Sequence, residues 1–182
     1  MRRFMGFAGL SLTSMVALAC LAIPGGAEAH SASDAYLTLT TGGSEAPGES
    51  TIHGQWDIAL RDLDFVLKLD EDGDGRVTWG EVHRKESAIQ QYAYQHLAID
   101  GGPGNPCRIT PVRQLIDGHA DGAYAALFFD AVCARAPRTI TLNYTLFFAI
   151  DPSHRGIVVM HRGAAVATAV VSPQNSRIDL IR

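Results

Sequence analysis

The sequence lacks any cluster of basic side chains. Its 182 residues hold 15 Lys and Arg against 19 Asp and Glu, which gives a net charge of −4 at pH 7. Nucleic-acid binding depends on grouped Lys and Arg that neutralise phosphates, so this composition argues against a nucleic-acid partner. Hydrophobic residues make up 47% and charged residues 19%, a balance that argues against a disordered chain.

The motifs of common catalytic sites are also absent. The chain has no Gly-x-Ser-x-Gly, no phosphate-binding loop and no Gly-x-Gly-x-x-Gly. Ser31, Ser33 and Asp34 lie close together but do not have the spacing of a hydrolase site. We therefore predict that the protein is not an enzyme, and we identify no small-molecule substrate. An enzyme that holds a structural calcium ion is the least favoured alternative.

Long apolar runs are scarce, and the longest lies at the N-terminus. Residues 4–23 carry no charge and follow Arg2 and Arg3, and a Pro-Gly-Gly sequence comes after them. Ala27 and Ala29 then provide the small residues that signal peptidase reads. This pattern predicts a signal peptide over residues 1–29 and a periplasmic or secreted domain over residues 30–182.

Two other readings of the N-terminus stay open. The apolar run is long enough to act as an uncleaved anchor helix. Cys20, preceded by Leu18 and Ala19, resembles part of a lipoprotein processing site. Further along the chain, residues 157–171 are apolar but are interrupted by His161 and Arg162, so they do not predict a membrane span.

Cysteine is rare, with three in the whole chain. Removal of the signal peptide takes Cys20 and leaves Cys107 and Cys133, an even pair in an oxidising compartment. We predict a disulfide between them, which stabilises the fold by roughly 3 kcal/mol in the chain-entropy model. Neither cysteine belongs to a Cys-x-x-Cys motif, so redox catalysis is not expected.

Most of the mature chain alternates between apolar and polar residues, as β-strands do. Helical spacing occurs only at 61–69 and 79–97, which flank an acidic segment. We predict an α+β fold, a mostly antiparallel β-sandwich with one helix–loop–helix insertion at about 61–97. The predicted strands are Ala35–Thr40, Ile52–Leu60, Cys107–Ile116, Gly122–Ala131, Thr139–Ile150, Ile157–Met160, Ala164–Val171 and Ile178–Ile181.

Residues 70–81 match the twelve-residue calcium loop of an EF-hand at every informative position. Asp70, Asp72 and Asp74 occupy positions 1, 3 and 5, where a curling backbone directs three carboxylates at one centre. Gly75 occupies position 6, where the backbone turns sharply with a positive φ. The remaining expected ligands are the Arg76 carbonyl, Thr78 and the bidentate carboxylate of Glu81.

The donor set of this loop identifies the expected ion. All the ligands are hard oxygens, in the number and flexibility that suit Ca²⁺ better than Mg²⁺. EF-hands usually occur in pairs, but this chain has one such loop. Bracing would come from the β-domain or from a second chain, or else the affinity is modest; we expect a monomer or weak dimer. We therefore predict a structural Ca²⁺ ion rather than a signalling switch.

Other acids and aromatic residues near the loop have simpler expected roles. Asp57, Asp62 and Asp64 either face water or pair with Arg61, with support of the calcium loop as the alternative. Trp56 and Trp79 are expected in the core.

Several segments resemble the exported N-terminal domain of bacterial HupE/UreJ-like membrane proteins. These are residues 30–39, the run Gly54–Phe65 that leads into the acidic loop, residues 78–82 and residues 151–157. In that family a multi-helix membrane domain associated with nickel or cobalt handling follows the exported domain. The chain ends at Arg182 without one. The resemblance therefore implies the location, the calcium loop and a polytopic membrane protein as partner, but not transport itself.

His30 raises a second functional hypothesis. As the first residue of the mature chain, its free amine and imidazole could together chelate Cu²⁺ or Ni²⁺. The main prediction is thus an exported, non-catalytic, calcium-binding accessory domain. The alternative is a periplasmic module that binds or delivers a transition metal through His30 to a HupE/UreJ-like partner. A solvated terminal residue is the simplest explanation of His30.

The N-terminus of the exported protein distinguishes the three forms of processing. We expect N-terminal sequencing of chain recovered from the periplasm of an expressing bacterium to begin at His30, because cleavage follows Ala29. A lipid-modified N-terminus at Cys20 would instead establish a lipoprotein. Membrane-bound protein that still begins at Met1 would contradict cleavage altogether.

Overall fold

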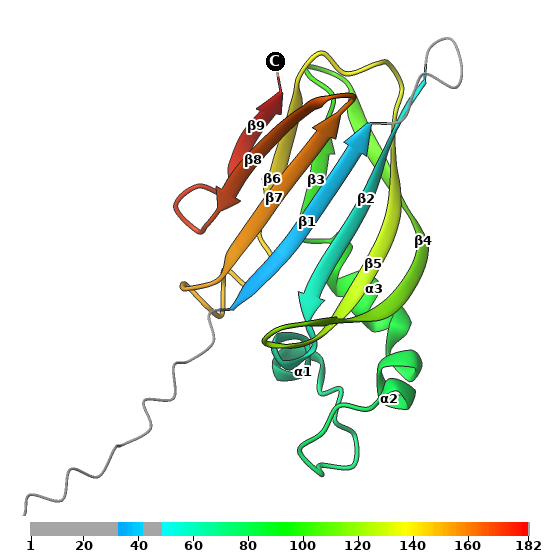
Figure 1. The fold of residues 1–182 in the computed structure, drawn as a ribbon, viewed down its shortest axis with the longest axis vertical. Helices are drawn as coiled ribbons and strands as arrows, with labels where there is room; N and C mark the ends of the chain where they lie inside the picture. Colours follow the sequence, from blue (N-terminus) through cyan, green and yellow to red (C-terminus); the bar gives the residue numbers. More distant parts are fainter. Residues whose placement is uncertain (1–32, 42–48, 182) are drawn as a thin grey trace, which may run out of the picture. The chain divides into compact units, whose positions relative to one another are not determined.

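Strands dominate the computed structural model, which describes residues 33–41 and 49–181 (Figure 1). Residues Ser31–Arg182 form one compact unit. The elements in chain order are β1 Asp34–Thr41, β2 Ser50–Ala59, α1 Leu60–Leu67, α2 Trp79–Arg84, α3 Glu86–Tyr94, β3 Leu97–Asp100, β4 Pro106–His119, β5 Gly122–Cys133, β6 Ile140–Tyr144, β7 Arg155–Arg162, β8 Ala165–Val171 and β9 Arg177–Ile181.

The nine strands of the described residues belong to one sheet, in the order β8-β7-β1-β2-β5-β4-β3-β6-β9. Every pairing is antiparallel except that of β1 with β7, which is parallel. The sheet curls until its two edge strands, β8 and β9, lie side by side (Figure 1). The prediction of a mostly antiparallel β fold with a small helical insertion between the second and third strands is confirmed. The two layers expected of a sandwich are formed by one continuous, barrel-like sheet.

The core fills the inside of this curled sheet. Period-two alternation places Leu37 on β1 and Trp56 on β2 at paired positions of the inner face, with no measurable exposure of the Trp56 side chain. Gly54 has a packing role here, because a Cβ at this position would collide with the Phe129 ring. The helices add Leu63, Val82 and Ile89 to the same cluster.

The helices lie at one end of the sheet, where β2 runs directly into α1 (Figure 1). The single helix predicted over 79–97 is divided at Lys85 and ends at Tyr94. It ends early because Leu97 and Ile99 are both buried and pair with β6. That long-range pairing outweighs the local helical pattern of residues 95–97.

The strand predicted over 139–150 ends at Tyr144. Alternation fails beyond it, because the neighbouring residues Leu146 and Phe147 are both buried. Phe147 has a φ of 58°, a left-handed conformation that turns the chain sharply. Its carbonyl accepts hydrogen bonds from the amides of Ile150 and Asp151, which close this turn.

The predicted disulfide between Cys107 and Cys133 is present and joins directly opposed residues of β4 and β5. It fixes the end of the longest strand pair, where β5 also pairs with β2 through Ser50. Trp56 lies in the core as predicted, but the prediction for Trp79 is wrong. Trp79 is 67% exposed and stacks on the His83 ring one turn along α2.

Removing the disulfide is expected to destabilise the fold without changing it. The double variant Cys107→Ala with Cys133→Ala should lose about 2–4 kcal/mol of unfolding free energy, because the unfolded chain regains the entropy that the crosslink removes. Urea denaturation followed by circular dichroism measures the loss. Equal midpoints for the oxidised, reduced and double-variant proteins would contradict this role.

Candidate metal centre

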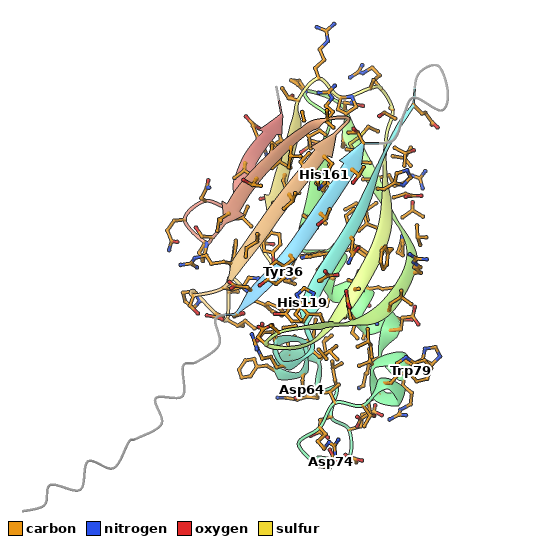
Figure 2. All side chains as sticks on the ribbon, viewed as in Figure 1. Tyr36, Asp64, Asp74, Trp79, His119 and His161 are labelled. Carbon is orange, nitrogen blue, oxygen red and sulfur yellow. A yellow bond between two sulfur atoms is a disulfide. The ribbon has the colours of Figure 1, made fainter. Side chains whose placement is uncertain are left out.

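The acidic loop connects α1 to α2 at the helical end of the sheet, with Asp74 at its tip (Figure 2). Carboxylate oxygens of Asp70, Asp72 and Asp74 lie within 4.8 Å of one another. Asp72 and Asp74 are exposed and Asp70 is half-buried. Three negative groups this close repel one another, so something must hold them together.

Backbone amides of the loop provide that support. Asp70 accepts hydrogen bonds from the N–H groups of Gly73, Asp74 and Gly75, at 2.8, 3.2 and 2.9 Å. Asp72 accepts from Asp74 N–H at 3.2 Å, and Asp74 accepts from Arg76 N–H at 2.8 Å. These bonds aim all three carboxylates toward the inside of the loop. Arg76 therefore contributes its backbone to the loop while its side chain stays exposed.

Glycine makes this tight course possible. Gly75, for which the sequence predicts a positive φ, has a φ of 81°, and Gly73 has a φ of 73°. Most other residues are strained in this region. A side chain at either position would meet open space, so the requirement for glycine comes from the backbone rather than from crowding.

Glu81 is held by a different set of hydrogen bonds. Its carboxylate accepts from the Thr78 hydroxyl at 2.7 Å, from Thr78 N–H at 2.8 Å and from Glu71 N–H at 2.9 Å. Thr78 in turn caps α2, which completes a capping box. The hydrogen bonds from the Thr78 side chain, Thr78 N–H and Glu71 N–H hold the pKa of Glu81 down at about 2. The residue is 3% exposed and stays charged at neutral pH.

Both ends of the loop are anchored to the rest of the molecule. Leu69 just before it and Val82 just after it are buried in the core. Asp64 on α1 accepts a hydrogen bond from Asp70 N–H at 2.9 Å, which supports the loop in the way the sequence raised as an alternative. Glu71 forms ion pairs with Arg84 at 2.8 Å and Lys85 at 3.3 Å, so the first turn of the loop is tied to α2.

Val77, at the eighth position of the loop, packs against the hydrophobic core of the β-domain. It lines a hollow of about 340 Å³ together with α1 and the turn between β4 and β5. In paired calcium loops this position contacts the partner loop. Here Val77 packs against the core of its own chain, which is compatible with the bracing by the β-domain that the sequence analysis gives as one alternative.

The structure thus brings Asp70, Asp72 and Asp74 together, and it places Thr78 and Glu81 at the start of α2. His30 lies outside the described residues, as does the predicted signal peptide. Within the described part of the chain, no helix has the length and hydropathy needed to cross a bilayer. The known protein families include none that matches this chain, and a comparison with curated proteins also finds no match.

A second polar group, which the sequence did not reveal, joins residues far apart in the chain. Ser33 Oγ lies 2.7 Å from Nδ1 of His154 and donates to Asp62 at 2.9 Å. His154 Nε2 lies 2.8 Å from the Tyr144 hydroxyl. All these bonds are satisfied when His154 is neutral, with its proton on Nδ1 toward Ser33 and Tyr144 donating to Nε2.

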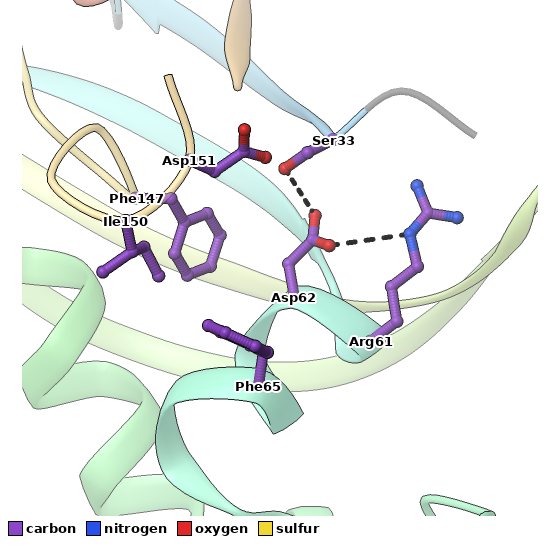
Figure 3. A pocket seen from close by; sticks show the side chains of 7 residues that line it. All are labelled: Ser33, Arg61, Asp62, Phe65, Phe147, Ile150 and Asp151. Carbon is purple, nitrogen blue, oxygen red and sulfur yellow. Dashed lines mark hydrogen bonds and ion pairs between the residues drawn. The ribbon is translucent and has the colours of Figure 1, made fainter. Parts of the chain in front are cut away.

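Beside this network is a hollow of about 420 Å³, with Phe65, Phe147 and Ile150 forming its apolar walls (Figure 3). Asp62 enters it from α1, where Arg61 Nε lies 3.6 Å from the Asp62 carboxylate (Figure 3). Burial raises the pKa of Asp62. The order of contacts differs from that of a serine hydrolase, because Asp62 bonds to the serine and not to the far nitrogen of the histidine.

A third group contains Asp57, Asp117 and His119, whose donor atoms lie within 4.8 Å of one another. The sequence contained a usable signal for it. Asp117 and His119 are two residues apart on a strand, and that spacing places both side chains on one face. A search for paired histidines misses this Asp-x-His pattern.

His154 predicts a specific acid sensitivity of the fold. Burial lowers the pKa of His154 to about 4, against about 6.5 for an exposed histidine. The unfolded chain therefore takes up a proton that the folded chain does not, so stability falls as the pH drops through this interval. We expect a loss of about 2 kcal/mol between about pH 7 and about pH 4.5 from this residue.

Urea denaturation at both pH values, with EDTA present, measures this difference. His154→Gln should be less stable at neutral pH but lose less stability on acidification, while the exposed-residue control His83→Gln should behave as wild type. A pH dependence that is the same in all three proteins would contradict the assignment to His154.

Proposed function

We propose that this protein is an exported, non-catalytic accessory domain that binds one Ca²⁺ ion in the loop 70–81. The observation that carries the proposal is the convergence of Asp70, Asp72 and Asp74 in a loop whose sequence matches the calcium-loop pattern throughout. The hydrogen bonds within the loop leave each of these carboxylates with further lone pairs that can bind an ion.

The donor set of the loop favours Ca²⁺ on chemical grounds. The carboxylates are hard ligands, and the loop offers enough oxygens for the six to eight contacts that Ca²⁺ takes. Their mutual repulsion weakens the loop when no cation is present. The ion would supply the missing positive charge, and Glu81 would complete the ligand set from the first turn of α2.

The anchors of the loop support a structural role for the ion. Leu69 and Val82 are fixed in the core, and Val77 packs against the β-domain, so the loop has little room to drive a large movement. Ordering it would stabilise α1 and α2 relative to the sheet. This favours a constitutive ion over a signalling switch.

Export and a membrane partner complete the proposal. The disulfide between Cys107 and Cys133 is compatible with an oxidising compartment. The partner proposed from the resemblance is a polytopic HupE/UreJ-like membrane protein, encoded separately or in a longer form of this chain. Exposed Phe65 and Ile150, at 68% and 47%, offer apolar contact area to such a partner.

Calorimetric titration of residues 30–182 with Ca²⁺ tests the proposal. We expect one ion to bind and to raise the melting temperature, by an amount equivalent to about 2.7 kcal/mol when free Ca²⁺ is a hundred times the Kd. Asp74→Asn and Glu81→Gln should each weaken binding at least about tenfold, because each removes a charged ligand.

Asp130→Asn is the matched control, since Asp130 is a half-exposed carboxylate on β5, outside the loop. It should bind Ca²⁺ as wild type does. If wild type shows neither binding nor stabilisation at millimolar Ca²⁺, or if Asp74→Asn and Glu81→Gln bind normally, the calcium function is wrong.

A further inference from the structure

The group formed by Asp57, Asp117 and His119 has the spacing of ligands around one small metal ion. Nε2 of His119 lies 3.5 Å from Oδ2 of Asp57. This is long for a hydrogen bond between nitrogen and oxygen, which is usually 2.9–3.0 Å. It is close to the separation of about 3.3 Å between two ligands at tetrahedral angles and about 2.05 Å from one ion.

Three neighbouring strands create this convergence. Asp57 on β2 pairs with Ala126 on β5, and Ala126 pairs with Leu115 on β4, so these positions share the outer face of the sheet. Asp117 and His119 follow Leu115 at period two and lie on the same face.

The imidazole of His119 is held in a fixed orientation. Its ring stacks against both Tyr36, at 5.1 Å, and Tyr124, at 4.1 Å, measured between ring centroids (His119 and Tyr36 are labelled in Figure 2). Tyr124 donates its hydroxyl proton to Asp121 at 2.9 Å, and Asp121 also pairs with Arg61 at 3.3 Å. Stacking restricts rotation of the ring, so binding a metal ion through it would cost less conformational entropy.

Asp57 adds an electrostatic reason for a cation. The residue is 8% exposed, and its carboxylate accepts hydrogen bonds from the Gln55 side-chain amide at 2.9 and 3.2 Å. The amide carries no charge, and the Asp117 carboxylate nearby is a second negative group. A cation between the two carboxylates would offset their mutual repulsion.

We propose that Asp57, Asp117 and His119 form a binding site for one divalent transition-metal ion of the Zn²⁺, Co²⁺ or Ni²⁺ type. One imidazole nitrogen with two carboxylate oxygens suits such ions and does not suit Ca²⁺, which takes oxygen ligands alone. Three protein ligands leave coordination positions on the exposed side, next to Asp117, for water or another ligand. The site is separate from the acidic loop in both residues and ion preference.

Co²⁺ is the probe for this site, because its visible absorption reports nitrogen and oxygen coordination directly. The protein is residues 30–182 with His30→Ala, which removes the imidazole that could chelate metal together with the terminal amine. Excess Ca²⁺ is present to occupy the acidic loop. We expect one Co²⁺ to bind with new absorption bands, and Zn²⁺ to displace it.

Variants assign the bound ion to the proposed ligands. His119→Gln and Asp57→Asn should each weaken Co²⁺ binding at least about tenfold, as loss of a ligand does. Asp117→Asn should do the same, and it alters an exposed position, so it decides the matter if a buried variant fails to fold. Thermal melts without metal identify any such failure.

His53→Gln is the matched control. His53 forms the other histidine–aspartate pair on the outer face, with Asp130 at 2.7 Å, a normal hydrogen-bond distance without a third ligand. It should bind Co²⁺ as wild type does, and so should Asp74→Asn. Co²⁺ that does not bind at millimolar concentration, or that binds equally well to Asp117→Asn, would overturn the proposal.

Discussion

The alternation of side chains along β2 is the constraint on which the rest of the structure depends. Trp56 points inward and fixes the centre of the core, while its neighbour Asp57 points outward. A register shift of one residue would exchange the two, turning the carboxylate into the apolar core and the indole onto the outer face. Because β2 also leads directly into α1, the same register sets where the acidic loop begins.

The carboxylates of the acidic loop are held in place by hydrogen bonds from backbone amides and neighbouring side chains. Asp70 illustrates this, because three N–H groups of its own loop bond to its carboxylate. Glu81 is fixed in the same way at the start of α2. Such groups are oriented by the protein itself, which would lower the entropic cost of the proposed ion binding. Tyr36 and Tyr124 do the same for the ring of His119 by stacking.

Local patterns were sufficient for much of this fold. The spacing of acids and glycine predicted the conformation of Gly75, and alternation located most strands. Prediction failed where distant residues decide the outcome. The helix ending at Tyr94 is shortened by pairing of Leu97 with a strand more than forty residues away, and the turn at Phe147 depends on burial of two adjacent side chains. Likewise, Asp57 and His119 become neighbours only through the register of β2, β5 and β4.

The position of β1 has a consequence for how the chain reaches this structure. The first strand lies inside the sheet, paired on one side with β2 and on the other with β7, whose residues come about 120 positions later. The sheet cannot close around its first strand until nearly the whole chain is available. Contacts of such long sequence separation make folding slow. Under the proposed export, this order of events would keep the chain extended while it crosses the membrane, because the native sheet cannot form early enough to block its passage.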